Sequence, residues 1–138
     1  MADLHRKVIT VRAPRRGLHE ITYEVDAIVR ASSIDEGLCN VFVTHTSASL
    51  TINENADPTA RADLEAFLDR LVPRDAPYFR HTMEGPDDMP SHIKSVLTDV
   101  SLTVPVSGGR LAMGTWQGIY LWEHRDGTPT RRIVVSVT

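Results

Sequence analysis

Four histidines have the widest chemical range of the side chains in this sequence: His45, His81, His92 and His124. Each is expected in a long loop or near the end of a helix or strand, where functional sites are commonly built. Imidazoles from separate elements could meet at one divalent metal ion, or they could transfer protons near neutral pH. The spacing contains no His-Glu-x-x-His pair, so it does not decide between these roles. Taken singly, each histidine is equally well explained as a surface or structural residue, and the hypothesis depends on their number.

Two adjacent carboxylates, Asp87 and Asp88, stand at the start of a predicted helix that contains Lys94. Carboxylates are ligands for hard cations such as Mg²⁺, and a lysine near a helix N-terminus attracts phosphate oxygens. The segment therefore predicts a site for a pyrophosphate with a divalent metal, Mg²⁺ being favoured and Zn²⁺ the alternative. Read alone, the segment is nearly as well explained by capping of the helix by Asp88.

The segment 43–58 is dense in hydroxyl and amide side chains, which both donate and accept hydrogen bonds. It follows an apolar run over 38–43 that predicts a strand, and it ends at Asp57-Pro58, which predicts a capped helix start. We interpret the part between them as a polar loop, so that a strand end and a helix N-terminus converge on a place suited to an anion. A well-hydrogen-bonded turn is the alternative. The candidate substrate-binding residues of this loop are Ser47, Ser49, Thr51, Asn53, Glu54 and Asn55.

Trp116 lies between Gly114 and Gly118, in a run over 110–125 that otherwise reads as one long strand. Glycine weakens a strand, so its presence indicates that something approaches the backbone closely. That could be a neighbouring subunit, a bulge or a flat ligand stacked near Trp116, while packing in the core is the commonest fate of a tryptophan. We include Trp116 and the adjacent Gln117 among the candidate substrate-binding residues.

The elements that must position these residues are mostly strands. Strands are predicted over 7–11, 38–43, 101–106, 110–125 and 131–138, helices begin near Thr22, Asp57 and Asp88, and a long loop covers 74–87. The run 110–125 has aromatic side chains on one face and aliphatic ones on the other, so both faces need cover. The pattern predicts an α+β fold, an antiparallel β-sandwich with two or three helices, with part of one face buried between subunits.

The length of 138 residues predicts a single domain over residues 1–138. With a net charge of −3, the chain lacks the basic balance of a duplex-binding domain, so nucleic acid is not an expected partner. No apolar run is long enough to span a bilayer and the N-terminus lacks a secretory pattern, which predicts no membrane partner. The lone Cys39 has no intramolecular partner and fits a reducing compartment. The expected location is therefore cytoplasmic.

Taken in order, the motifs of this chain resemble those of the YjbQ family. They are His45 to Thr51, Asn53-Glu54-Asn55, Asp57-Pro58, Gly85, Asp87 to Lys94, Gly109-Arg110 and Gly114 to Ile119. The likeness covers nearly the whole chain and implies a compact α+β domain with a β-sandwich, assembled as a homotrimer. It also implies a secondary thiamine-phosphate synthase activity, which joins hydroxymethylpyrimidine pyrophosphate to thiazole phosphate and releases pyrophosphate.

The resemblance, combined with the chemistry of the residues, suggests a role for each candidate. Pyrophosphate departure needs cations and preorganised donors rather than a protein nucleophile. The expected roles are magnesium binding for Asp87 and Asp88, phosphate contacts for Lys94 and Arg110, orientation for Ser47, Ser49 and Thr51, and proton transfer or metal ligation for His45, His81, His92 and His124. A metal-dependent hydrolase of a small phosphorylated molecule and a non-enzymatic trimeric anion-binding protein are the alternatives.

Two departures from the family pattern are visible. The family's Tyr-x-His is replaced by Tyr78-Phe79-Arg80-His81, which is one residue longer, so Tyr78 is not expected to point where its counterparts do. Ala56 stands where a cysteine often precedes the Asp-Pro pair. This argues against thiol chemistry at that position.

Overall fold

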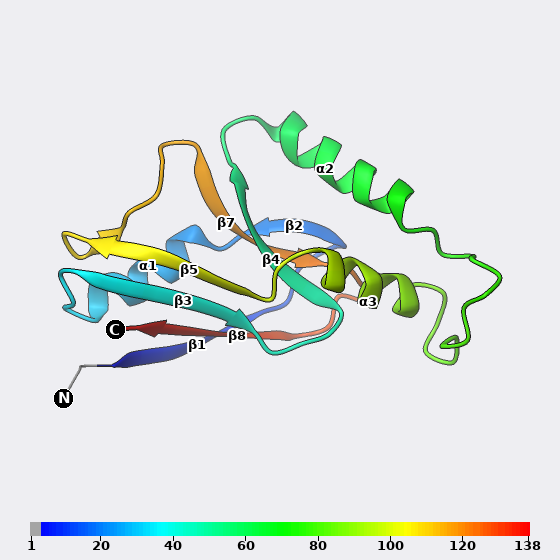
Figure 1. Ribbon diagram of the computed structural model, residues 1–138, viewed down its shortest axis with the longest axis horizontal. Coiled ribbons are helices and arrows are strands. Elements are labelled where there is room, and N and C mark those ends of the chain that lie inside the picture. Colours follow the sequence, from blue (N-terminus) through cyan, green and yellow to red (C-terminus); the bar gives the residue numbers. More distant parts are fainter. Residues whose placement is uncertain (1–3) are drawn as a thin grey trace.

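The computed structural model describes residues 4–138 as strands with three helices (Figure 1). The elements in chain order are β1 His5–Val11, β2 Gly17–Glu20, α1 Thr22–Ala31, β3 Gly37–Val43, β4 Ala48–Glu54, α2 Pro58–Leu71, α3 Asp88–Leu97, β5 Ser101–Ser107, β6 Arg110–Leu111, β7 Gln117–Glu123 and β8 Arg131–Val137. The predicted α+β class, the helices and the long loop before α3 are confirmed. Among these 135 described positions, no helix is long and apolar enough to cross a membrane.

The strands form two antiparallel sheets. One has five strands in the order β1-β8-β3-β5-β6, and the other has three in the order β2-β7-β4. Successive side chains of a strand point to opposite faces, and in β8 this buries Ile133, Val135 and Val137 completely. The main core joins the inner faces of both sheets, and Val25 and Val29 of α1 complete it. The two sheets therefore face a common core, as the alternating pattern of the last strand predicts.

A second, smaller core covers the outer face of β7. Tyr120 and Trp122 pack there against Leu18 of β2 and against Leu68 of α2, whereas Ile119 and Leu121 point into the main core. Tyr120 and Trp122 are thus covered within one chain by α2, and the burial of part of a face between subunits stays a prediction. The C-terminal half of β7 is consequently held from two sides.

Two predicted elements are corrected by the structure. The supposed polar loop after β3 contains a regular strand, β4, in which Ala48 and Leu50 are buried on one face. Because seven residues of strand span roughly 20 Å, His45 and the helix start at Asp57 lie at opposite ends of β4 and do not converge. The run 110–125 is two strands in different sheets, since the chain leaves β6 after two residues and enters the three-stranded sheet at Gln117.

The caps of the helices also differ from expectation in part. Asp57 caps α2 as predicted, because its Oδ1 accepts the backbone N–H of Thr59 at 2.9 Å. Asp88, by contrast, is the first residue within α3 and makes no capping bond. Thr22 is likewise inside α1, and its hydroxyl donates to Glu20 at 2.8 Å. The Asp88 carboxylate is therefore free for contacts other than capping.

Candidate functional site

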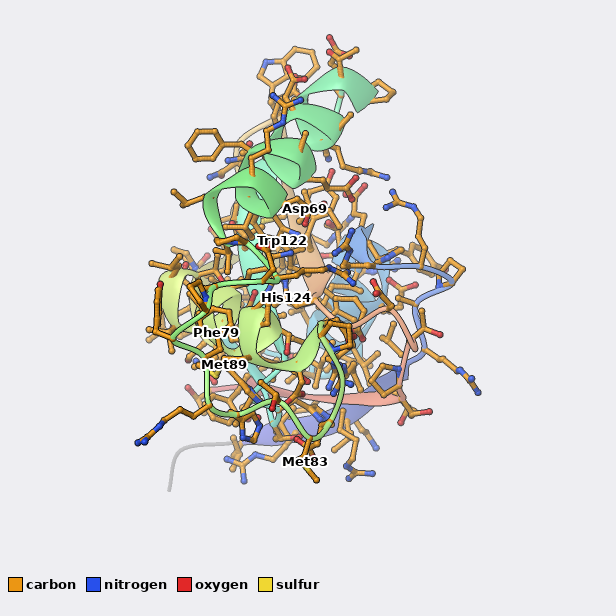
Figure 2. The ribbon with its side chains drawn as sticks, turned by 90° about the vertical axis from the view of Figure 1, so that its right-hand side faces the viewer. Asp69, Phe79, Met83, Met89, Trp122 and His124 are labelled. Atoms are coloured by element: carbon orange, nitrogen blue, oxygen red, sulfur yellow. The ribbon has the colours of Figure 1, made fainter. Side chains whose placement is uncertain are left out.

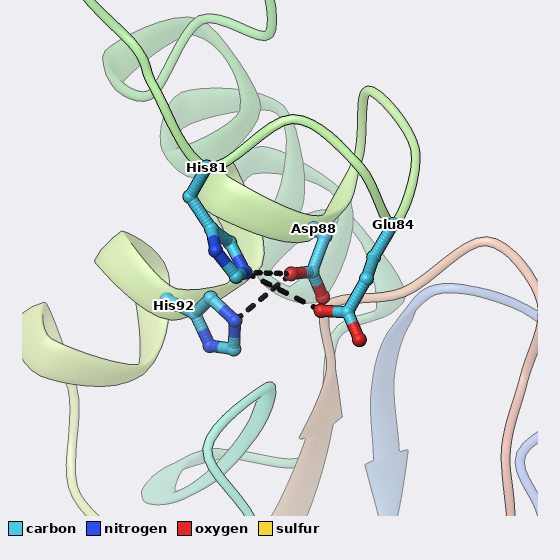
Figure 3. Close-up of side chains that lie close together, drawn as sticks. All are labelled: His81, Glu84, Asp88 and His92. Carbon is cyan, nitrogen blue, oxygen red and sulfur yellow. Dashed lines mark hydrogen bonds and ion pairs between the residues drawn. The ribbon is translucent and has the colours of Figure 1, made fainter.

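Four side chains at the start of α3 and in the loop before it converge on one point: His81, Glu84, Asp88 and His92 (Figure 3). We call them the His/carboxylate cluster. Their nearest ligand atoms all lie within 4.8 Å of one another. The Nε2 atoms of His81 and His92 lie 2.7 and 3.0 Å from the same oxygen, Asp88 Oδ2. His81 Nε2 also lies 3.3 Å from Glu84 Oε2, so two imidazoles and two carboxylates share one small volume.

Arg125, which follows β7, holds the acidic side of this cluster in place. Its guanidinium donates to Asp88 Oδ1 at 2.6 Å, to Asp87 Oδ2 at 2.9 Å and to the backbone carbonyl of Glu84 at 3.0 Å. Burial raises the pKa of Asp87, but hydrogen bonds from Arg125 and from the N–H of Asp126 outweigh burial and lower it. Asp87 is thereby committed to Arg125 and Asp126, and only Asp88 belongs to the cluster.

The backbone carbonyl of Thr46 sets the tautomer of His92. The Nδ1 of His92 lies 2.9 Å from this carbonyl, which can only accept, so Nδ1 carries the proton. In the neutral ring, the lone pair is then on Nε2, the atom that faces Asp88. This is the arrangement typical of a metal-bound histidine, whose second nitrogen donates to a backbone carbonyl.

A hollow of about 630 Å³ adjoins the cluster, and His92 belongs to both. It is lined by His45, Thr46, His92, Ser95, Val96, Thr98 and Val100. The Nε2 of His45 accepts the backbone N–H of Arg132 at 2.9 Å. Three of the four predicted histidines, His45, His81 and His92, thus lie around one locality at the N-terminal end of β4.

The fourth histidine belongs to a largely buried polar network at the start of β4 and the ends of β7 and β8, next to Thr98, the C-cap of α3. This network comprises Ser47, Ser49, Thr98, Glu123, His124 and Arg131. His124 Nε2 lies 2.8 Å from Ser49 Oγ, and the centroid of its ring lies 5.7 Å from that of Trp122, with the two rings tilted by 40°. Figure 2 shows Asp69, Trp122 and His124 following one another from α2 toward α3. Burial, followed by the charges of Lys94 and Arg131, lowers the pKa of His124 to about 3.

Two further candidates, Ser47 and Lys94, are engaged inside the chain near α3. Arg131 forms a buried ion pair with Glu123 at 2.6 Å and also donates to the Ser47 hydroxyl at 2.9 Å. The Lys94 ammonium is buried and donates to Asp69 of α2 at 2.6 Å. The phosphate contact predicted for Lys94 stays a prediction, and its observed contact ties α3 to α2.

The remaining candidates lie toward the other end of β4. Thr51, Asn53 and Glu54 lie on β4, where they pair with Tyr120, Gly118 and Gln117 of β7, and Asn55 donates to Glu20 and to the Gln117 carbonyl at 3.3 Å each. Trp116 is 64% exposed, and Gln117 accepts the N–H of Gly114 at 2.7 Å. A side chain at Gly118 would collide with the Glu20 carboxylate, so the approaching group inferred from this glycine is a side chain of the same chain.

Arg110 lies in a different hollow, of about 520 Å³, and pairs with Asp26 at 3.0 Å. That hollow is also lined by the carboxylates Glu20 and Glu24. Within one chain, Arg110 therefore does not join the histidines. Its predicted role toward phosphate, like those of Trp116 and Gln117 toward substrate, stays a prediction.

Sequence reasoning missed Glu84 as a potential ligand and Arg125 as the residue that holds the acidic pair. The local sequence carries no helical signal for Glu84, because 81–87 is irregular loop and only Asp88 and His92, four residues apart, share the helix. Nothing in the local sequence near Arg125 indicates its partners, because they are about forty residues away.

The fold and the cluster together define a class: a small α+β protein of two antiparallel sheets, with a His/carboxylate cluster of metal-ligating type beside an open hollow. The particular family follows from the sequence as a whole. The family described as UPF0047 protein YjbQ-like matches residues 7–138, and the chain belongs to it.

Relatives and solved structures agree with this assignment. The chain is 48% identical over 134 residues to the UPF0047 protein YjbQ of Salmonella typhimurium, covering 96% of each. It is 46% identical to a UPF0047 protein of Synechocystis, covering 97% of this chain and 91% of the relative. A crystal structure of a YbjQ-like protein of unknown function from Sulfolobus solfataricus superposes with a TM-score of 0.89 at 28% identity, covering 98% and 96% of the two chains. A conserved hypothetical protein from Thermus thermophilus gives a TM-score of 0.85 at 38% identity, covering 96% and 99%.

Proposed function

We propose that this chain is a metal-dependent enzyme acting on a small phosphorylated substrate, with one Zn²⁺-type ion held by His81, Asp88 and His92. Glu84 is then the fourth ligand or a base beside the ion. The sequence favours Mg²⁺, but two imidazole nitrogens with carboxylate oxygens are a donor set typical of zinc, whereas magnesium prefers oxygen ligands. Asp87 does not belong to this set, because Arg125 and Asp126 occupy its Oδ2.

The observation that carries the proposal is the approach of two Nε2 atoms to one carboxylate oxygen. With its Nδ1 proton on the Thr46 carbonyl, a neutral His92 directs a lone pair at Asp88 Oδ2, and that contact is repulsive. Either the ring is an imidazolium or a cation lies between the atoms. Asp88 already pairs with Arg125 through Oδ1. The further positive charge needed at Oδ2 therefore comes either from a protonated histidine or from a bound cation. A shared metal ion also explains why His81 and Glu84 converge on the same point.

The cluster has the access that a substrate needs. The side chains of His81 and Glu84 are 51% and 64% exposed, while Asp88 is buried beneath them. A bound metal ion would act there as a Lewis acid that stabilises charge on phosphate oxygens. The chain itself orients the ligands, through Thr46 and Arg125, and supplies the adjoining hollow for the organic part of the substrate.

Within this proposal the specific reaction is the thiamine-phosphate synthase type, in which hydroxymethylpyrimidine pyrophosphate is coupled to thiazole phosphate. Its support is the family resemblance together with the chemistry, since a departing pyrophosphate needs charge stabilisation and no protein nucleophile. Hydrolysis of a small phosphorylated molecule is the second candidate. The exposure of Glu84 favours it, because an open coordination position beside a carboxylate admits water.

The homotrimer implied by the resemblance is part of the proposal. Its support is a pair of exposed apolar side chains beside the hollow and outside its lining, Phe42 and Leu97. Exposed apolar patches of this kind commonly mark contacts between chains. Light scattering of the purified chain is expected to give three times the mass of one chain, and a monomeric mass would overturn this part.

The test of the function is an assay with zinc-loaded protein given both precursors. The coupled product is expected, and His92→Ala is expected to abolish it while His19→Ala, a histidine outside the cluster, leaves it unchanged. Free phosphate or pyrophosphate released without coupling would favour the hydrolase. If neither product forms while the zinc-loaded protein still binds phosphate, the enzyme proposal is wrong and an anion-binding protein remains.

A further inference from the structure

His45 completes the hydrogen-bond ladder between β3 and β8. The N–H of Thr44 donates to the Arg132 carbonyl at 3.2 Å, and one residue later the His45 ring accepts the Arg132 N–H through Nε2 at 2.9 Å. An imidazole nitrogen that accepts a backbone N–H has its lone pair in that bond. The proton of the neutral ring is therefore on Nδ1, which can only donate.

The environment keeps this ring neutral. Burial, and next the charge of Arg131, lowers the pKa of His45. A neutral imidazole with a fixed Nδ1 proton is a donor that does not change its role near neutral pH. It cannot act as a base through Nε2 unless the bond to Arg132 is broken.

The free nitrogen is available to a ligand. His45 is half-buried and lines the hollow that His92 shares with the His/carboxylate cluster. Within residues 4–138 its Nδ1 has no hydrogen-bond partner, and it is not among the buried unpartnered atoms, so solvent reaches it. The lining between the two histidines is partly apolar, with Val96 and Val100.

We propose that His45 donates its Nδ1 proton to an oxygen of the bound phosphate ester, and that it is neither a base nor a metal ligand. This inference rests on the proposed function, because it takes the substrate's phosphate to lie at the His/carboxylate cluster. It defines the substrate class as a phosphate ester with an apolar organic group, which lies against Val96 and Val100 while its oxygens face His45 and the ion at the His/carboxylate cluster.

Two substitutions separate the donor from the structural role. In His45→Gln, the side-chain amide oxygen reaches the position of Nε2 and keeps the bond to Arg132, but no donor stands in place of Nδ1. In His45→Asn, the amide nitrogen takes the position of Nδ1 and keeps the donor, but the bond to Arg132 is lost. His45→Gln therefore lacks only the donor of the histidine, and His45→Asn lacks only its acceptor.

The experiment is calorimetric titration of zinc-loaded protein with phenyl phosphate, with zinc affinity and the urea midpoint measured for each variant. His45→Gln is expected to weaken phenyl phosphate binding about tenfold with zinc affinity and stability unchanged, since a hydrogen bond to a charged group contributes that much. His45→Asn is expected to bind within about threefold of wild type, at a lower urea midpoint.

The reverse pattern, or no binding of phenyl phosphate to the wild-type protein, would overturn the inference. Failure of the proposed function gives a different result, because the wild-type protein would then not bind zinc at all. In that case the same titration of the metal-free variants decides the role of His45 alone.

Discussion

The His/carboxylate cluster at the start of α3 and the buried polar network next to its C-cap treat the same kind of side chain, histidine, in opposite ways. His81 and His92 are partly exposed and turn a nitrogen toward carboxylates. His124 is sealed from solvent, contacts the Ser49 hydroxyl and has a pKa of about 3. The first environment leaves ligand atoms open to an added ion. The second uses its hydrogen bonds to hold β4, β7 and β8 together, although the buried His124 Nδ1 has no partner among residues 4–138. Exposure to solvent, rather than residue type, distinguishes the candidate site from the buried polar network.

Loss of a side chain is expected to have different consequences in the two regions. In the buried network, removal of one partner leaves another polar group unpaired away from water, so the loss appears in folding stability. In the cluster, water can replace a lost side chain, so the loss appears in ligand affinity. Each prediction below tests one side of this division.

The largest expected effect is in the buried network. Arg131→Met leaves the fully buried Glu123 without its ion-pair partner and is expected to lower the free energy of unfolding by about 3–5 kcal/mol. Urea unfolding measures it, with Arg132→Met, an exposed neighbour, as the control that stays near wild type. A loss below about 1 kcal/mol would show that Glu123 is neutral or hydrated and would weaken the comparison.

The second effect is in the cluster. His81→Ala removes a half-exposed side chain, so the stability of the metal-free protein is expected to stay within about 0.5 kcal/mol of wild type. Zinc affinity is expected to fall by more than about 100-fold, the upper range for changes outside a ligand set. Isothermal titration with zinc measures this, and an affinity equal to that of His19→Ala would exclude His81 as a ligand.

The third effect concerns pH. The pKa of His124 is lowered from 6.5 to about 3, so between these values the unfolded chain binds more protons than the folded one and stability is lost as pH falls. At pH 4.5 this histidine alone is expected to cost roughly 2–3 kcal/mol relative to pH 7. Urea midpoints at both pH values measure it. His124→Gln, whose amide oxygen reaches the position of Nε2 and can still accept from Ser49, should show a smaller loss, and an equal loss would locate the sensitivity elsewhere.

The smallest expected effect is at the end of β4 that lies away from the His/carboxylate cluster. In Gly118→Ala, the added methyl group meets the Glu20 carboxylate and Asn55, and overpacking of this kind costs about 1–2 kcal/mol. Zinc affinity is expected to be unchanged, because this end lies roughly 20 Å along β4 from the cluster. A large fall in zinc affinity would mean that the two ends are coupled.

Much of the fold could be predicted from alternation and capping in the sequence. β8 and β3 are recognisable from β-branched residues at alternate positions, and the start of α2 from Asp57-Pro58. β4 was misread because Ser49 and Thr51 are polar, although Ala48, Leu50 and Ile52 alternate with them as in a strand. The polarity of Ser49 reflects its bond to His124, a partner 75 residues away that no local pattern reveals.

The candidate site could be predicted only in part for the same reason. His81, Asp88 and His92 were identified from their type and their place near a helix start, and the structure brings them together. The commitment of Asp87 to Arg125, of Lys94 to Asp69 and of Arg110 to Asp26 depends on tertiary contacts between distant segments. A list of charged residues does not reveal which of them are already paired.

The most direct test of the central claim is anomalous X-ray scattering at the zinc edge from crystals grown with Zn²⁺. One strong peak is expected within bonding distance of His81 Nε2, Asp88 Oδ2 and His92 Nε2, with Glu84 at or near the fourth position. A peak at Asp87, a peak on His124, or no peak in this cluster at saturating zinc would contradict it.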